Sequence, residues 1–150
     1  MLRPEFIVLQ SKAASAEEVI KQLSDLFLAH DIVKESYCEA VVERERQYPT
    51  GLPSKEVFIA IPHTDSSHVK ESGIAIATLE TPVSFGMMGD AEKKLDVGLV
   101  MLLAIADPQK QLELLKNIMG VLSNGSLLKS IKEASTAEQV AGVLLPHLAS

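Results

Sequence analysis

The run Val-Phe-Ile-Ala-Ile-Pro-His at residues 57–63 decides how this chain folds. Its first five residues are apolar and mostly β-branched or aromatic, which indicates a strand buried in the interior of a sheet. Pro62 cannot donate a hydrogen bond to a neighbouring strand, so we expect the strand to end there. His63 therefore follows directly on a buried strand and is held by the stiff backbone of Pro62.

Further apolar runs on either side of this strand predict the rest of the sheet. Strands are expected at Glu5–Leu9, Gly73–Leu79 and Val97–Ala106. Pro82–Phe85 predicts a short edge segment that leads into a turn over Gly86–Asp90, because glycine and aspartate are typical of turns.

Helix starts are marked by serine followed three positions later by glutamate, the pattern of a capping box. This pattern predicts three helices, beginning at Ser15, Ser36 and Ser135 and ending near His30, Gln47 and His147. Asp107-Pro108 predicts a fourth helix start, since aspartate favours the N-cap and proline the first helical position.

The fourth helix is expected to end at Asn124–Gly125 and to be followed by a short helix over Ser126–Lys132. Its apolar face is expected to consist of Leu112, Leu115, Ile118, Met119 and Leu122. Strands alternating with helices over 150 residues predict a single α/β domain, residues 1–150, with one sheet sandwiched between helices.

The composition excludes several classes of protein. Hydrophobic residues make up 47% of the chain, enough for a sizeable core, and the net charge of −6 disfavours binding to nucleic acid or anionic membranes. The single cysteine, Cys38, excludes an internal disulfide framework. The longest apolar run is half a membrane span, and no secretory signal is visible, so we expect a cytoplasmic protein without membrane insertion.

His63 is the first candidate for chemistry. Ligand sites of open α/β sheets lie at the carboxyl ends of strands, and a neutral imidazole nitrogen can attack phosphorus when its other nitrogen is held. The hydroxyl of Thr64 and those of Ser66 and Ser67 could then donate to phosphate oxygens. The spacing alone also allows an ordinary loop histidine after a strand.

Other polar residues admit two interpretations each. His63, Asp65 and His68 could ligate a metal, although the spacing matches no common site and no further strong ligand is near in sequence. His68 could instead support His63 or lie in solvent. Arg44 and Arg46 could form a solvated helix face, or one of them could reach a phosphoryl group, because guanidinium matches phosphate geometry.

Several motifs together resemble the fructose–mannitol–galactitol class of enzyme IIA proteins of the bacterial phosphoenolpyruvate-dependent sugar phosphotransferase system, and most of all its galactitol branch. The resemblance covers nearly the whole chain. It rests on Ala40-x-x-x-Arg44-Glu45, Pro49-Thr50-Gly51, Ile59-Ala60-Ile61-Pro62-His63, Thr81-Pro82-Val83, Leu95-Asp96-Val97 and Gln111-Leu112-x-Leu114-Leu115.

The resemblance implies a mixed central sheet flanked by helices on both faces, and a phosphocarrier that needs no cofactor and no metal. It implies that His63 accepts a phosphoryl group from the phosphocarrier HPr and passes it to a cysteine of a IIB component. The IIB component then phosphorylates the sugar that enters through a IIC transporter. Arg44 is implied to approach the phosphohistidine, with Thr50, Thr64, His68 and Gln111 as supporting residues.

This sequence departs from the family pattern at two positions. Many members carry a second histidine where Gln111 stands, and glutamine cannot carry a proton as histidine does. Many also have glycine where Thr64 stands. Two other functions remain open: a regulatory module of a nitrogen-related phosphorelay, whose phosphorylation controls protein binding, and a small metal-dependent hydrolase using His63, Asp65 and His68.

Overall fold

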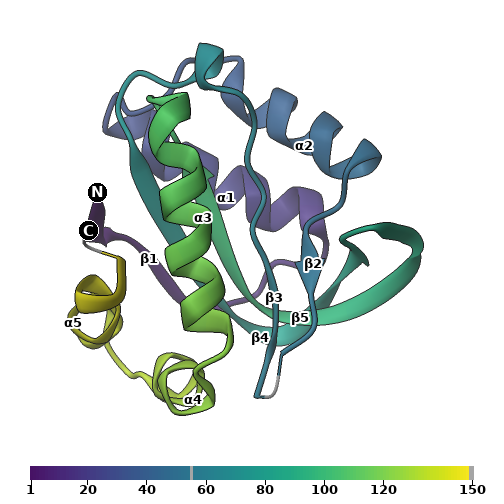
Figure 1. The fold of residues 1–150 in the computed structure, drawn as a ribbon, viewed down its shortest axis with the longest axis vertical. Coiled ribbons are helices and arrows are strands. Elements are labelled where there is room, and N and C mark those ends of the chain that lie inside the picture. The colour runs from purple at the N-terminus through teal and green to yellow at the C-terminus, as the bar shows by residue number, and fades with distance from the viewer. Residues whose placement is uncertain (55, 149–150) are drawn as a thin grey trace.

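A mixed five-stranded sheet with helices on both faces forms the protein, as Figure 1 shows for a computed structural model that describes residues 1–54 and 56–148. This architecture confirms the predicted fold class. The elements in chain order are β1 (Leu2–Ser11), α1 (Ala16–Ala29), α2 (Tyr37–Gln47), β2 (Gly51–Leu52), β3 (Phe58–Ala60), the 3-10 helix η1 (Ser66–His68), β4 (Gly73–Met87), β5 (Asp90–Ala104), α3 (Pro108–Leu122), α4 (Gly125–Glu133) and α5 (Ala137–Leu148).

The strand that precedes His63 lies inside the sheet, as its apolar sequence predicts. β3 pairs parallel with β5 on one side and antiparallel with β2 on the other. β4 pairs antiparallel with β5 and parallel with β1, and it meets β2 where Met87 pairs with Gly51. Ile59 and Ala60 are fully buried because helices cover both faces of the strand.

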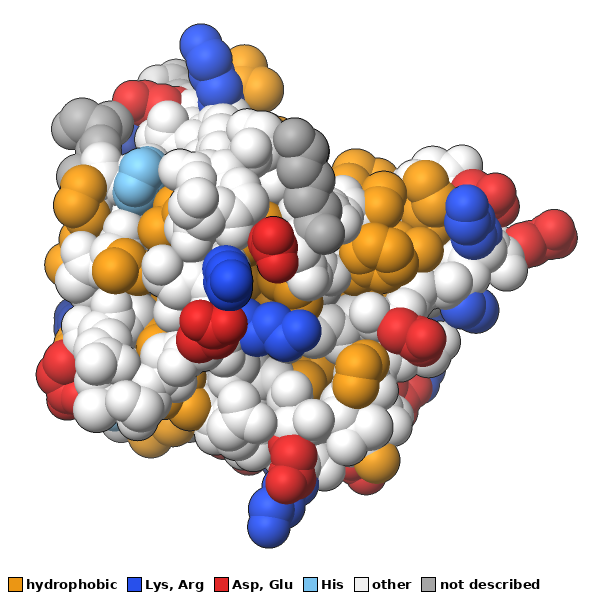
Figure 2. All heavy atoms as spheres, turned by 90° about the horizontal axis from the view of Figure 1, so that it is seen from below, with side chains coloured by type: hydrophobic (Ala, Val, Ile, Leu, Met, Phe, Trp, Pro, Cys, Tyr) orange, Lys and Arg blue, Asp and Glu red, His pale blue; other side chains and the backbone are white. Residues whose placement is uncertain are grey.

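The predicted strands Gly73–Leu79 and Pro82–Phe85 are one continuous strand, β4, which is a correction. β5 likewise begins at Asp90 rather than at Val97, because its polar first half continues the antiparallel pairing. A break in the register between Thr78 and Val83 accommodates the proline between them. The resulting hairpin arm curves away from the body (Figure 1) and carries charged side chains near its outer end (Figure 2).

Two apolar layers lie on opposite faces of the sheet. One contains side chains of α1 and α2, including Phe27 and Tyr37, packed against alternate residues of the strands. The other contains side chains of α3, α4 and α5, including Ile118 and Leu144. Among the described residues, no helix has the length and apolar character needed to cross a bilayer.

Two predicted capping boxes differ from the structure. Ser36 has helical backbone angles and makes no cap hydrogen bond, because its hydroxyl oxygen pairs with Nδ1 of His68 at 2.7 Å. The last box is shifted by one residue: Thr136 Oγ1 accepts from the Gln139 amide, and Gln139 Oε1 accepts from the Ser135 amide. The N-cap of the first box is confirmed, since Ser15 Oγ accepts from the Glu18 amide, but the Glu18 carboxylate accepts from the Ala14 amide rather than from that of Ser15.

α3 begins as predicted, with Asp107 accepting from the Gln109 amide, but its buried face is rotated. Leu114, Ile118 and Val121 are buried, whereas Leu112 is 78% exposed and Met119 is also exposed. The sequence contains apolar residues on more than one side of this helix, so periodicity alone selects the wrong stripe. The helix ends at Leu122, and Asn124 caps the start of α4 rather than ending α3.

Candidate functional site

His63 lies immediately beyond β3 in a backbone segment that is fixed at three points. Its Nδ1 atom is 2.8 Å from the carbonyl oxygen of Ile61. The carbonyl oxygen of Pro62 accepts a hydrogen bond from the Leu103 amide at 3.0 Å, which ties the segment to β5. The Ile61 amide donates to Thr50 Oγ1 at 3.1 Å. These hydrogen bonds thus fix the backbone that carries the histidine, just beyond the carboxyl end of the interior strand β3.

The hydrogen bond to Ile61 assigns the tautomer of His63. A carbonyl oxygen can only accept, so Nδ1 must carry the hydrogen, and Nε2 of the neutral ring keeps a free lone pair. Burial lowers the pKa of His63 below its usual 6.5; the Ile61 hydrogen bond opposes this, and the nearby Arg44 charge lowers the pKa further. The ring is therefore neutral at neutral pH, as a nucleophile must be.

The two candidate arginines of α2 have different surroundings. Arg46 forms ion pairs with Glu17 of α1 and with Glu43, which makes it part of a solvated helix face. Arg44 lies with its guanidinium carbon 5.6 Å from the centre of the Tyr48 ring, and its charge acts on His63. Arg44 is exposed, and no described residue forms an ion pair with it. Arg44 is therefore the arginine available to an anion near His63.

Thr50 joins α2 to the backbone that carries His63. Its hydroxyl donates to Glu45 Oε1 at 2.8 Å, its amide donates to Glu45 Oε2 at 2.8 Å, and the hydroxyl oxygen accepts from the Ile61 amide. The neighbouring Gly51 is required by the close approach of β2 to β4, because a Cβ there would lie 2.5 Å from the Gly86 carbonyl oxygen. Thr50 is thus a structural link rather than a free hydroxyl.

Glu45 belongs to this site, although the sequence alone indicates no role for it. Burial raises the pKa of its carboxyl from 4.5 to about 7, although the hydrogen bonds from Thr50 and the charge of Arg44 act in the opposite direction. The only signal in the sequence is its place in the motif between two arginines, shortly before Thr50. Such a signal does not tell a solvated helix glutamate from one that turns inward.

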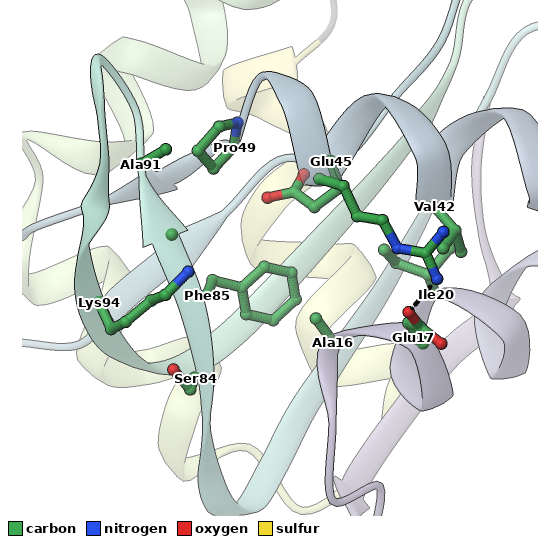
Figure 3. A pocket seen from close by; sticks show the side chains of 12 residues that line it. Ala16, Glu17, Ile20, Val42, Glu45, Pro49, Ser84, Phe85, Ala91 and Lys94 are labelled. Carbon is green, nitrogen blue, oxygen red and sulfur yellow. Dashed lines mark hydrogen bonds and ion pairs between the residues drawn. The ribbon is translucent and has the colours of Figure 1, made fainter.

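A cavity of about 250 Å³ reaches Glu45 from the side of α1 and the β4–β5 hairpin (Figure 3). Its walls are apolar at Ile20, Val42 and Phe85, and Lys94 extends into it from β5. The cavity gives the Glu45 carboxyl a route for proton exchange with solvent.

The remaining predicted residues lie around His63 with other partners. Thr64 is buried and its hydroxyl donates to Asp65 Oδ1 at 3.2 Å, while Ser67 Oγ donates to Asp65 Oδ2 at 2.7 Å. These hydrogen bonds lower the pKa of Asp65, and the one from Ser67 has the largest effect. His68 contacts Ser36, and Gln111 is half-buried in the first turn of α3, where its side chain forms no hydrogen bond with a described residue.

The hypothesis of a metal site based on His63, Asp65 and His68 gains no support. Over the described residues, no three histidine, cysteine, aspartate or glutamate side chains come together in a way that could hold a metal ion. The Asp65 carboxylate instead accepts hydrogen bonds from the hydroxyls of Thr64 and Ser67, and the His68 ring is hydrogen-bonded with Ser36.

Proteins of known family match this chain over most of its length. The sequence model of the phosphoenolpyruvate-dependent sugar phosphotransferase system EIIA 2 family matches residues 1–146. The galactitol-specific EIIA component of Escherichia coli is 31% identical over 114 residues, covering 76% of this chain and 75% of the relative. The mannitol-specific enzyme IIA component of Geobacillus stearothermophilus is 30% identical over 148 residues, covering 96% of this chain and 94% of the relative.

Solved structures of IIA proteins have the same fold as this chain. The crystal structure of mannitol IIA from Escherichia coli has a TM-score of 0.78 at 25% identity, covering 96% of this chain and 99% of that one. The nitrogen regulatory protein IIA-Ntr from Neisseria meningitidis has a TM-score of 0.76 at 25% identity, covering 95% of both chains.

The fold is also that of the IIA mannitol enzyme solved in complex with phosphorylated IIB from Escherichia coli, with a TM-score of 0.77 at 23% identity and coverage of 97% of this chain and 99% of that one. Because the family model spans residues 1–146 and a relative 31% identical is covered over three quarters of its length, this chain belongs to the EIIA 2 family of the phosphoenolpyruvate-dependent sugar phosphotransferase system.

Proposed function

We propose that residues 1–150 form one phosphocarrier domain, which accepts a phosphoryl group from phospho-HPr on Nε2 of His63 and passes it to a IIB component. The observation that carries this proposal is the hydrogen bond from Nδ1 of His63 to the Ile61 carbonyl oxygen, which leaves Nε2 as the nucleophile. The membership of the EIIA 2 family supports the role of phosphocarrier.

The forward step forms one bond and breaks one. The Nε2 lone pair of His63 attacks phosphorus, the bond between phosphorus and the donor atom of phospho-HPr breaks, and its electron pair leaves with the donor. Positive charge develops on the imidazole ring as the new bond forms. The Ile61 carbonyl oxygen, already bound to Nδ1–H, stabilises that charge without reorganisation.

Arg44 is proposed to offset the negative charge of the transferred group. A guanidinium presents several N–H donors in a plane, which matches the oxygens of a phosphoryl group. The side chain is exposed and near enough to lower the pKa of His63, so it can reach an anion bound to the ring. Thr64 and His68 are proposed as local supports of the loop after His63, and Gln111 as a hydrogen-bond donor from α3.

The acceptor of the phosphoryl group is proposed to be a IIB component, because a related IIA enzyme was solved together with phosphorylated IIB. The carrier is proposed to work in the cytoplasm, where the relay would supply the phosphoryl group for sugar that crosses the membrane through a separate IIC transporter. The galactitol-specific relative at 31% identity favours galactitol or a related polyol as the transported sugar. A regulatory role is the second candidate, supported by the structural likeness to IIA-Ntr.

The test is transfer of label from phosphoenolpyruvate through enzyme I and HPr. We expect the protein to acquire an acid-labile, base-stable phosphoryl group, and His63→Ala to acquire none. His147→Ala, which changes an exposed histidine near the end of α5, is the matched control and should be labelled like the original protein. Adding IIB components specific for galactitol, mannitol or fructose one at a time then identifies the acceptor; transfer to none of them favours the regulatory role.

A further inference from the structure

We infer that Glu45 and Thr50 are positioning residues for the phosphoryl transfer: Glu45 holds Thr50, and Thr50 holds the Ile61 backbone that orients the His63 ring. This inference rests on the proposed function of His63. It concerns two residues that touch neither the phosphoryl group nor the attacking nitrogen.

The hydrogen bonds form an unbroken series from α2 to the imidazole. Both oxygens of the Glu45 carboxylate accept from Thr50, one from its amide and one from its hydroxyl, each at 2.8 Å. The Thr50 hydroxyl oxygen accepts from the Ile61 amide at 3.1 Å, and the Ile61 carbonyl oxygen accepts from Nδ1 of His63 at 2.8 Å. Four residues are therefore placed relative to one another by four hydrogen bonds.

This series of hydrogen bonds affects His63 by fixing the geometry of the backbone at Ile61. The amide and carbonyl groups of Ile61 belong to two successive peptide units that share only its Cα atom, so polarisation is not passed directly from one to the other. What the Thr50 hydroxyl fixes is the rotation of the backbone at Ile61, and with it the direction of the carbonyl oxygen that holds the ring. A small displacement of a reacting atom is costly, since transfer depends on an aligned approach.

The chemistry of the Glu45 carboxyl makes this series dependent on pH. An ionised carboxylate accepts both Thr50 donors, whereas a protonated one has a hydroxyl of its own and accepts them less well. The Thr50 hydroxyl must then accept from Glu45 and turn its own hydrogen elsewhere. The raised pKa of Glu45, at about 7, sets this change close to neutral pH.

The charged groups facing Glu45 come from three elements. Glu17 lies on α1, Arg44 and Arg46 on α2, and Lys94 on β5, and all but Arg44 line the cavity beside the carboxyl. The residues of β4 in the same cavity, Ser84 to Gly86, carry no charge. Arg46 forms ion pairs with Glu17 and Glu43. Its positive charge is largely offset by theirs, so its electrostatic effect on Glu45 is small.

The test compares two pairs of variants by rapid-mixing transfer from phospho-HPr. Thr50→Val removes the hydroxyl but keeps the shape, and we expect the maximal rate to fall about tenfold with an unchanged KM, because Thr50 is buried and does not meet the donor. Thr50→Ser restores the hydroxyl and should restore most of the rate. Equal rates for Thr50→Val and the original protein would overturn the inference.

The second pair is Glu45→Gln with Glu43→Gln as its control on the same helix. A glutamine side chain has an NH2 group in place of one carboxylate oxygen, so it cannot accept at both positions where Glu45 meets the Thr50 amide and hydroxyl. We expect the maximal rate of the original protein to rise between pH 6 and 8 as Glu45 ionises, with a midpoint near 7, and Glu45→Gln to lose this rise. Glu43→Gln should keep that rise. A rise of the same size and midpoint in Glu45→Gln would contradict the role assigned to Glu45.

A measurement of the tautomer of the His63 ring distinguishes a failure of this inference from a failure of the proposed function. Nitrogen-15 spectra of unphosphorylated protein report the tautomer of His63 whether or not transfer occurs. We expect almost pure Nδ1–H tautomer in the original protein and a mixture in Thr50→Val. If the original protein takes no phosphoryl group but the tautomer shifts, the proposed function fails and the orienting role of Thr50 stands. If it is phosphorylated and neither rate nor tautomer changes, only this inference fails.

Discussion

Nδ1 of His63 lies 2.8 Å from the carbonyl oxygen of Ile61, two residues earlier in the chain, so the backbone itself holds the ring that follows it. Pro62 stands between them and fixes its own φ, which limits the ways this loop can bend. The same bond decides which nitrogen is free. The reactivity of the histidine thus follows from the local sequence Ile-Pro-His and from the strand that precedes it.

The pKa of His63 is expected to lie below 6.5 in the folded protein, because burial disfavours the charged ring. An NMR titration of the ring signals measures it directly. Arg44→Gln should move the pKa upward, since the arginine charge lowers it. A pKa at or above 6.5 in the original protein would show that the ring is more solvated than the structure indicates.

Arg44→Gln is expected to fold normally and to slow transfer by about ten- to a hundredfold, the effect of losing one hydrogen bond to a charged group. Arg46→Gln is the matched control, because its guanidinium is engaged with Glu17 and Glu43 on the surface. Its transfer rate should stay within about twofold of the original. Similar losses in both variants would mean that general charge on α2, rather than Arg44, favours the reaction.

Gly51→Ala is expected to destabilise the fold by about 1–3 kcal/mol, because the added Cβ would lie 2.5 Å from the carbonyl oxygen of Gly86. Chemical denaturation measures the change. Gly120→Ala, in the interior of α3 with no atom within 4 Å of the new Cβ, is the control and should stabilise by about 0.5–1 kcal/mol. A neutral Gly51→Ala would show that β2 and β4 can separate without cost.

Glu45 is expected to lower the stability of the protein as the pH rises. Its pKa is about 7 in the fold and 4.5 in the unfolded reference, so between these values the folded state binds the extra proton. Stability from this group is complete below pH 4.5 and is lost as the pH rises through 7. Each pKa unit is about 1.4 kcal/mol, so the loss is on the order of 2 kcal/mol after allowance for partial solvation.

Denaturation of the original protein and of Glu45→Gln at several pH values isolates this contribution. The difference in unfolding free energy between them should change between pH 5 and pH 8 in the direction that favours Glu45→Gln at high pH. A difference independent of pH would mean that Glu45 titrates at its ordinary value. His63 acts in the opposite direction below pH 6.5 and cancels from the comparison, since both proteins contain it.

Much of the fold follows from local patterns in the sequence. The apolar run before Pro62 predicts an interior strand, and Asp107-Pro108 predicts the start of α3, because these signals depend on a few adjacent residues. The length of the β4–β5 hairpin was not predictable in the same way. The first residues of β5, 90–94, are mostly charged, so their pairing depends on the partner strand β4 rather than on their own hydrophobicity.

The residues of the candidate site also differ in how far the sequence predicts them. His63 and Arg44 could be selected from the motif, with the resemblance to the enzyme IIA class deciding between open alternatives. Glu45 could not be selected, because nothing in the order of residues shows that its side chain turns toward Thr50 while Glu43 stays in solvent. The lack of a helix cap at Ser36 could not be predicted either, because its tertiary partner His68 lies 32 residues away and competes with the cap.

The central claim is most directly tested by nitrogen-15 and phosphorus-31 NMR of the protein before and after phosphorylation by enzyme I, HPr and phosphoenolpyruvate. The account predicts one phosphoryl group on Nε2 of His63, with the hydrogen on Nδ1 retained and still bound to the Ile61 carbonyl oxygen. A phosphoryl group on Nδ1 of His63, on another residue, or on none would contradict it.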